Sequence, residues 1–213
     1  MVLQLQEDVR IRLEAICTPA DLAVGQVLEH GGPRGKGLPI YFLETGTVSL
    51  WIEPNDQQAM AVGLIGGGAM VGGSHLWSAP SPHWVARVLV AGRALATPPD
   101  QLRSLTAQCP ALLLAMSQFL WGQTQEIAQL SARMLLGDIR TRLALWLHLI
   151  HHKTGQTNLS ITHDMLARML GTRRVSITLA AGELQTEGVI ALGRGVIAIH
   201  DIQALTRIAG LKD

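Results

Sequence analysis

Between residues 20 and 100 the chain alternates short runs of β-forming residues with clusters of turn residues, repeated every 8–12 residues. The run V-S-L-W-I at 48–52 has the alternation of a half-buried strand. Two further runs, at 84–90 and 93–96, are separated by a short glycine-containing turn. Short strands at this spacing predict a β-barrel or β-sandwich.

The hydrophobic period changes beyond residue 100, where apolar residues recur at helical spacing. They fill the a and d positions of about three heptads, with one polar interruption. A helix over 110–136 would be roughly 40 Å long at its ordinary rise per residue. We expect this seam to contact a second copy of the chain through Leu113, Met116, Leu120, Gln123, Ile127, Leu130 and Met134.

The long helix is unusually poor in charge, because only Glu126 and Arg133 are charged between residues 111 and 136. Most of its faces must therefore be covered. The β domain can cover one face and another chain a second, which favours a homodimer. The alternative is an ordinary core helix of a monomer.

A helix-turn-helix pattern follows a second helix that begins at 137–138 and runs to 151–152. Thr162 is suited to cap a short helix, and Gly171 stands where a left-handed residue would end it. Thr172 is then placed to cap the next helix, whose apolar residues recur at helical spacing. Two helices joined by a short glycine turn predict a helix-turn-helix.

The exposed start of that next helix carries side chains suited to DNA. Arginine can make bidentate contacts with guanine and phosphate, and hydroxyl groups can contact phosphate. Residues 189–199 predict a two-stranded wing with an arginine at its tip. The candidate DNA contacts are Arg173, Arg174, Ser176, Thr178, Thr162 and Arg194. The alternative for Arg173 and Arg174 is a solvated surface pair.

Charge and composition narrow the class of protein. With 48% hydrophobic and 15% charged residues, the 213-residue chain can bury a full core. Residues 1–136 carry 8 basic and 10 acidic residues, a net of −2, whereas residues 137–213 carry 9 and 6, a net of +3. The C-terminal third is therefore the part expected to meet phosphate.

Two distant cysteines, Cys17 and Cys109, argue against a disulfide framework, a zinc ribbon or a four-cysteine iron–sulfur cluster. They are typical of a reducing cytoplasm, where we expect the protein to reside. The N-terminal residues predict no signal peptide, and the apolar stretch at 111–122 is too short to span a bilayer. No membrane partner is expected.

The order of these motifs resembles the cyclic-AMP receptor protein and fumarate–nitrate regulator (CRP/FNR) superfamily over nearly the whole chain. I-Y-F-L-E-T-G-T-V-S-L-W at 40–51 and V-G-L-I-G-G-G-A-M-V-G-G-S at 62–74 are similar to the family's β-roll motifs. D-I-R-T-R-L-A-L-W-L at 138–147 is similar to the start of the helix after the dimer helix. Arg174-Val175-Ser176-Ile177 is similar to the core of the recognition helix.

The resemblance implies an α+β fold in three parts. These are a β-roll sensor domain over 1–107, a dimerisation helix over 108–136 and a winged helix-turn-helix over 137–213. The β-roll would be a double-stranded β-helix, a jelly roll of the cyclic-nucleotide-binding type. It also implies a transcription regulator that binds double-stranded DNA as a homodimer, with RNA polymerase as a further candidate partner.

The family's cyclic-nucleotide site is not matched. Where the family has Gly-Glu and Arg-Ser, this chain has Gly72-Gly73 and Ser81-Pro82, so both charged partners are missing. A buried phosphate without a cation is unfavourable by several kcal/mol or more. We therefore expect an effector other than cyclic AMP. The pocket predicted by the resemblance consists of Gly72, Gly73, Ser74, Ser81, Trp84, Gln123 and Ile127.

Other cofactors are weighed by their ligands. Without a cysteine cluster an iron–sulfur centre is not expected, whereas haem stays open, with His75, His83 and Cys17 as ligand candidates. The residues His148, His151 and His152 have helical spacing suited to zinc, but no carboxylate or cysteine accompanies them.

The recognition helix also departs from the family, because Val175 replaces an acidic base-reader and Leu179 a basic residue. DNA binding is therefore implied, but not the family's familiar operator. One alternative is a sensor whose helix-turn-helix mediates protein contacts, which a weak dependence of affinity on salt would reveal. An enzyme is not expected, because no nucleophile elbow, P-loop, H-E-x-x-H or paired carboxylate motif is present.

Overall fold

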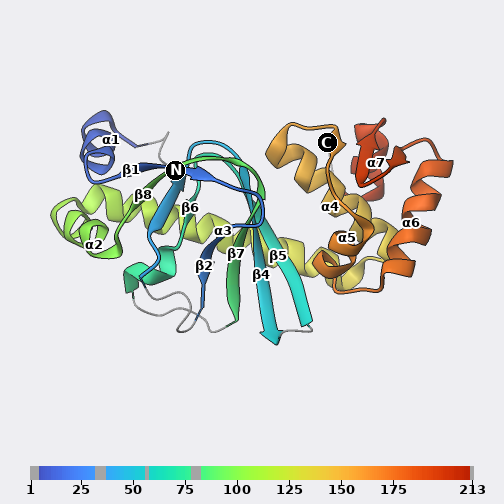
Figure 1. Cartoon of the computed structure of the whole chain (residues 1–213), viewed down its shortest axis with the longest axis horizontal. Coiled ribbons are helices and arrows are strands. Elements are labelled where there is room, and N and C mark those ends of the chain that lie inside the picture. Colours follow the sequence, from blue (N-terminus) through green and yellow to red (C-terminus); the bar gives the residue numbers. More distant parts are fainter. Residues whose placement is uncertain (1–4, 32–36, 56–57, 78–82, 212–213) are drawn as a thin grey trace.

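The structure, a computed structural model, describes residues 5–31, 37–55, 58–77 and 83–211 (Figure 1). It combines an N-terminal β domain with a C-terminal helical unit, joined by one long helix. Within the part of the chain that is described, no helix is both long enough and apolar enough to cross a membrane.

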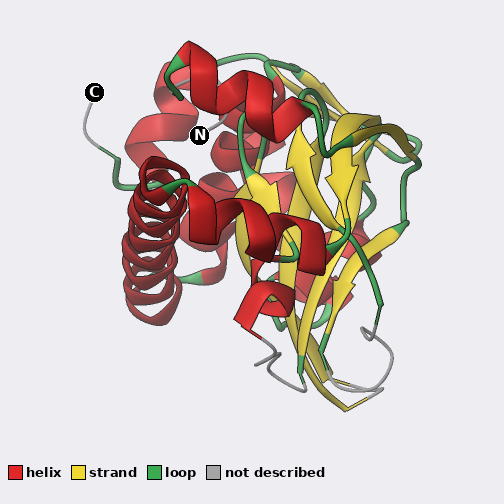
Figure 2. Cartoon of the chain, turned by 90° about the vertical axis from the view of Figure 1, so that its left-hand side faces the viewer, coloured by secondary structure: helices red, strands yellow, loops and turns green. Residues whose placement is uncertain are grey.

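The β domain consists of two antiparallel four-stranded sheets, in agreement with the predicted barrel or sandwich. Their strand orders are β1-β8-β3-β6 and β2-β7-β4-β5, and Figure 2 shows the strands gathered on one side of the molecule. Apolar side chains from both sheets form a shared core. The strands are β1 Thr18–Leu22, β2 Val27–His30, β3 Ile40–Leu43, β4 Thr47–Asn55, β5 Gln58–Ile65, β6 Met70–Val71, β7 Trp84–Val90 and β8 Gly92–Thr97.

Two short helices close one end of the β domain, α1 (Glu7–Glu14) and α2 (Pro99–Gln108). Together with the 3-10 helix Gly73–Trp77 and the start of the long helix, they surround a second apolar cluster, in which Leu13 and Leu102 are fully buried.

The long helix α3 (Pro110–Leu136) leads from the β domain to the C-terminal unit (Figure 1). Helix α4 (Ile139–Thr154) follows after Asp138, whose side chain accepts a hydrogen bond from the backbone N–H of Thr141 at 2.7 Å. This bond lowers the pKa of the Asp138 carboxyl group. The left-handed Gly155 (φ +69°) ends the helix.

The C-terminal unit has the predicted winged helix-turn-helix order. A third strand joins the predicted hairpin, so the small sheet runs β10-β11-β9. Its core centres on Trp146 and continues without a break into the outer face of β4 and β5. The elements are β9 Asn158–Leu159, α5 His163–Met169, α6 Arg174–Thr186, β10 Ile190–Gly193, β11 Val196–Ile199 and α7 Ile202–Ile208.

The predicted seam of α3 lies mostly against the chain's own domains. Met116 is fully buried in the N-terminal cluster and Leu130 is buried in the C-terminal one. The expectation that these two side chains contact another chain is therefore corrected. Leu113 is exposed, whereas Leu120, Gln123, Ile127 and Met134 are half-buried.

A fully exposed row of α3 lies one residue further along the sequence than Leu113, Leu120, Ile127 and Met134. Leu114, Trp121, Ala128 and Leu135 are all exposed and are spaced by seven residues. Trp121 is 65% exposed and Leu135 84%. We call these four residues the α3 row.

A tight turn in the β domain provides a test of the packing. A Cβ atom on Gly92 would lie 2.3 Å from the backbone oxygen of Thr45, so Gly92→Ala forces the backbone apart. We expect it to lower the free energy of unfolding by about 1–3 kcal/mol, as overpacking does. Gly122→Ala is the control, because a Cβ there meets nothing within 4 Å. It should raise stability by about 0.5–1 kcal/mol. Urea unfolding measures both, and equal effects would contradict this packing.

Candidate nucleic-acid interface

The helix-turn-helix is formed by α5 and α6 and by the turn between them. The hydroxyl group of Thr162 accepts a hydrogen bond from the N–H of Met165 at 3.1 Å, which confirms Thr162 as the N-cap of α5. Gly171 takes the predicted left-handed conformation, with φ +59°. Thr172, however, does not cap α6. Arg173 occupies the N-cap position, and no side chain makes the capping hydrogen bond.

Arg142 on α4 holds the turn between α5 and α6 in place. Its guanidinium group donates a hydrogen bond to the carbonyl of Leu170, which is the C-cap residue of α5. Burial lowers the pKa of Arg142, but an arginine side chain titrates so far above neutrality that it stays charged in the cell. A cation at the end of α5 also suits the partial negative charge of that helix terminus.

One side of α6 is buried and the opposite side is open. Ile177, Ala180, Ala181 and Leu184 form the buried stripe against the rest of the unit. Arg173 and Arg174 are exposed at the start of the helix.

Arg174 pairs with Asp164 on α5 at 3.1 Å, and both side chains are about two-thirds exposed. Such an exposed pair is worth little, typically about 0–1 kcal/mol, so a phosphate can replace the carboxylate.

Two of the hydroxyl groups that were predicted to contact DNA are hydrogen-bonded or partly buried within the chain. Thr178 donates a hydrogen bond to the carbonyl of Arg174 at 3.1 Å, and its oxygen lies 3.0 Å from Nδ1 of His163. Ser176 is half-buried. His163 thus stands on the interface surface, although no motif in the sequence distinguished it from the other histidines.

The wing is the hairpin of β10 and β11. Gly195 turns it with φ +72°, and Arg194 is exposed beside it at the tip. The wing arginine and the two arginines of α6 are therefore all exposed. Their role in contacting DNA stays a prediction.

The predicted effector pocket is a cavity of about 360 Å³ between the β domain and α3. It brings together Gly72, Gly73, Ser74, Trp84 and Gln123. Ile127 lines a different cavity, and Ser81 lies outside the described residues.

An acidic side chain that the sequence analysis missed lies in this pocket. Glu29 on β2 is only 5% exposed. Its carboxylate accepts hydrogen bonds from the N–H of Gly72 and from the indole N–H of Trp84, both at 3.1 Å, and from the hydroxyl group of Ser74. Glu29 lies 43 residues before Gly72 in a short strand, so no local motif could join the two.

This arrangement disfavours a phosphate ligand. The backbone and side-chain donors that would bind an anion already bind a carboxylate of the chain, and a second negative charge beside it would be repelled. The position of Glu29 and the absence of the family's arginine therefore both disfavour a phosphate ligand.

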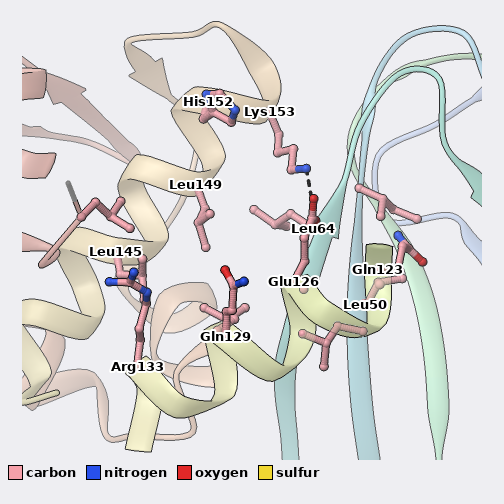
Figure 3. Close-up of a pocket in the computed structure, with 15 residues that line it drawn as sticks. Leu50, Leu64, Gln123, Glu126, Gln129, Arg133, Leu145, Leu149, His152 and Lys153 are labelled. Atoms are coloured by element: carbon pink, nitrogen blue, oxygen red, sulfur yellow. Dashed lines mark hydrogen bonds and ion pairs between the residues drawn. The ribbon is translucent and has the colours of Figure 1, made fainter. Parts of the chain in front are cut away.

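A second cavity of about 230 Å³ lies between the β domain and the C-terminal unit (Figure 3). Seven leucine and isoleucine side chains from β4, β5, α3 and α4 line it, together with polar and charged side chains of α3 and α4. Lys153 on α4 points toward Glu126 on α3, with 3.4 Å between Nζ and the carboxylate oxygen.

Comparisons with known proteins agree with this geometry. Residues 141–208 match the model of the Crp-like helix-turn-helix domain. The transcriptional regulator SdrP of Thermus thermophilus is 27% identical over 192 residues, which cover 87% of this chain and 91% of SdrP. The CRP-like protein Clp of Xanthomonas campestris is 24% identical over 185 residues, covering 80% of this chain and 79% of Clp.

Solved structures extend the likeness to the whole fold. A CRP/FNR-family transcriptional regulator from Thermus thermophilus superposes with a TM-score of 0.74 at 25% identity, covering 91% of this chain and 98% of that protein. The chain is therefore similar to transcription regulators of the CRP/FNR type over nearly its whole length. Clp of Xanthomonas campestris, described as responsive to c-di-GMP, shares the fold with a TM-score of 0.76 at 19% identity, covering 92% of this chain and all of that one.

The relatives named here are regulators and not enzymes, which agrees with the expectation for this chain. They leave the effector open.

Among the described residues, no group of three or more His, Cys, Asp or Glu side chains is placed to hold a metal ion. His148 and His152 stack with their ring centroids 6.2 Å apart, while Nδ1 of His151 lies 2.8 Å from the carbonyl oxygen of Gln156. Burial is the main cause that lowers the pKa of His148. Burial also raises the pKa of Cys17 to about 11, so its thiol stays protonated and is a poor metal ligand.

The role of Glu29 can be tested by truncation. Glu29→Ala removes the acceptor of one buried and two partly buried donors, so we expect the free energy of unfolding to fall by about 1–3 kcal/mol. Glu29→Gln keeps one acceptor oxygen and should lose less. The control is Glu44→Ala, whose side chain is exposed, with an expected change within about 0.5 kcal/mol. Equal unfolding curves for Glu29→Ala and Glu44→Ala would refute the role of Glu29.

Proposed function

We propose that this regulator binds a two-fold symmetric operator in double-stranded DNA as a homodimer. Each α6 helix would enter a major groove, with the two half-sites about 34–36 Å apart. Three exposed arginines support this role: Arg173 and Arg174 at the start of α6, and Arg194 on the wing. The charge balance of +3 in residues 137–213 supports it as well.

The α3 row supports the dimer. Four exposed side chains repeat every seven residues, and three of them are Leu114, Trp121 and Leu135. Seven-residue spacing keeps such a row facing a partner helix along a supercoil. A row of large apolar side chains in water is unfavourable, so burial against the same row of a second copy stabilises the pair.

The three predicted parts of the chain take these roles: 1–107 senses, 108–136 pairs two copies, and 137–213 binds DNA. The effector would be neither cyclic AMP nor another phosphate that needs the donors around Glu29. A contact with RNA polymerase stays a prediction. The alternative, a helix-turn-helix that binds protein, has no observation in its favour beyond the fold.

The DNA contacts are tested by gel mobility shift against a palindrome selected from random duplexes. Arg173→Ala combined with Arg174→Ala removes up to four phosphate contacts per dimer. The slope of log affinity against log salt concentration should therefore become less steep by about 3 to 4. Arg10→Ala combined with Arg12→Ala removes the same charge from α1, at the opposite end of the molecule (Figure 1). That control should bind as the wild type does. Identical affinity for both double variants would exclude the proposed contacts.

The dimer is tested with a charge placed in the α3 row. Trp121→Glu puts a carboxylate on each copy of the interface, so we expect a monomer at micromolar concentration in light scattering coupled to gel filtration. Val24→Glu is the matched control, because Val24 is 67% exposed and lies outside α3. It should stay dimeric. A wild-type monomer, or a dimeric Trp121→Glu variant, would contradict the proposed interface.

A further inference from the structure

Helix α6 carries an apolar pair on the side that points away from the chain. Val175 is 68% exposed and Leu179 is 65% exposed. At 100° per residue the two side chains lie opposite the buried stripe that contains Ile177 and Ala181. They are one turn apart and form a continuous apolar surface on the helix.

Packing inside the chain does not explain this surface. The exposed side chains of Val175 and Leu179 bury little apolar surface within the chain. A polar residue at either position would therefore lose no packing. Gly182 lies on the same side of α6, and a Cβ there would meet nothing within 4 Å. A glycine inside a helix costs about 0.5–1 kcal/mol relative to alanine. The exposed apolar pair and the glycine beside it are both explained if this surface contacts an external partner that approaches the helix closely.

The charges around the pair identify that partner as duplex DNA. Arg173 and Arg174 stand at the N-terminal end of the same helix, and Arg194 stands on the wing. Cations at the edge of an apolar strip match a major groove, where phosphates line the rim and base edges form the floor. Among the base edges, only thymine presents an apolar group, its 5-methyl.

We propose that Val175 and Leu179 are specificity-determining residues that contact thymine 5-methyl groups in each half-site. This proposal rests on the proposed function, because α6 must lie in the major groove. Aliphatic side chains offer no donor or acceptor, so they cannot distinguish guanine or cytosine by hydrogen bonds. The two residues are about 6 Å apart along the helix axis. Because base pairs rise by about 3.4 Å, the thymines belong on neighbouring or next-neighbouring base pairs.

The test removes the methyl group alone. Deoxyuridine differs from thymidine only by lacking this group, so it keeps the hydrogen bonds and the backbone. We expect each exchange of thymine for uracil at these positions to weaken binding about fourfold. The same exchange in both half-sites should weaken it about fifteenfold. Operators are first selected from random duplexes, and affinities are then measured at one salt concentration.

A matched pair of variants assigns the effect to the two side chains. Val175→Ala combined with Leu179→Ala should bind the thymine operator as weakly as the wild type binds the uracil one. It should also no longer distinguish the two operators, while its salt slope stays unchanged. Gln185→Ala, another exposed position on α6, should keep the full thymine preference. Thermal unfolding checks that all variants are folded.

The outcomes separate this proposal from the function on which it rests. If the wild type binds its selected operator with equal affinity in the thymine and uracil forms, the methyl contacts are refuted and the proposed DNA binding stands. If the selected half-sites lack thymines at this spacing, the result is the same. If no duplex is bound, both proposals are overturned.

Discussion

The helix-turn-helix of α5 and α6 is held in place by an apolar core that it shares with the β domain. Trp51 and Leu64, on β4 and β5, belong to the same buried cluster as Trp146 on α4 and Met169 on α5. The guanidinium group of Arg168 lies 6.0 Å from the ring centroid of Trp51 and covers this junction from outside. Because the cluster is continuous, the orientation of α5 and α6 is set by packing and not by a flexible linker.

Two further contacts fix the position of the turn between α5 and α6. A Cβ on Gly171 would meet Met60 of β5 at 3.5 Å, so the turn lies directly against the β4–β5 hairpin. From the other side, Arg142 caps the end of α5. A movement of the hairpin would therefore reach α6 without passing through the long helix. The cavity between β4, β5, α3 and α4 lies beside this route.

Much of this arrangement could be predicted from the sequence, because it depends on local signals. The cap at Thr162 and the left-handed Gly171 mark the helix-turn-helix within about ten residues. The turn-punctuated strands likewise predicted the β domain. Both are patterns whose physical cause lies in the residues themselves.

The parts that were missed depend on contacts between distant segments. Helix α3 is apolar around most of its circumference, so periodicity could not distinguish the face that meets its own domains from the face that stays open. The predicted seam for that reason included Met116 and Leu130, which are buried within the chain, and left out the α3 row. Glu29 was missed because its three donors lie more than 40 residues away in sequence. Neither feature has a local signature.

The account depends most on the claim that two copies, paired along α3, hold their α6 helices at a fixed separation. The spacing of the operator half-sites tests this claim most directly. Inserting about five base pairs, half a helical turn, between the half-sites moves one of them to the opposite side of the duplex. The account predicts that affinity falls to the level of unrelated DNA. Unchanged affinity would show that the two helix-turn-helix units bind DNA independently, and it would contradict this account.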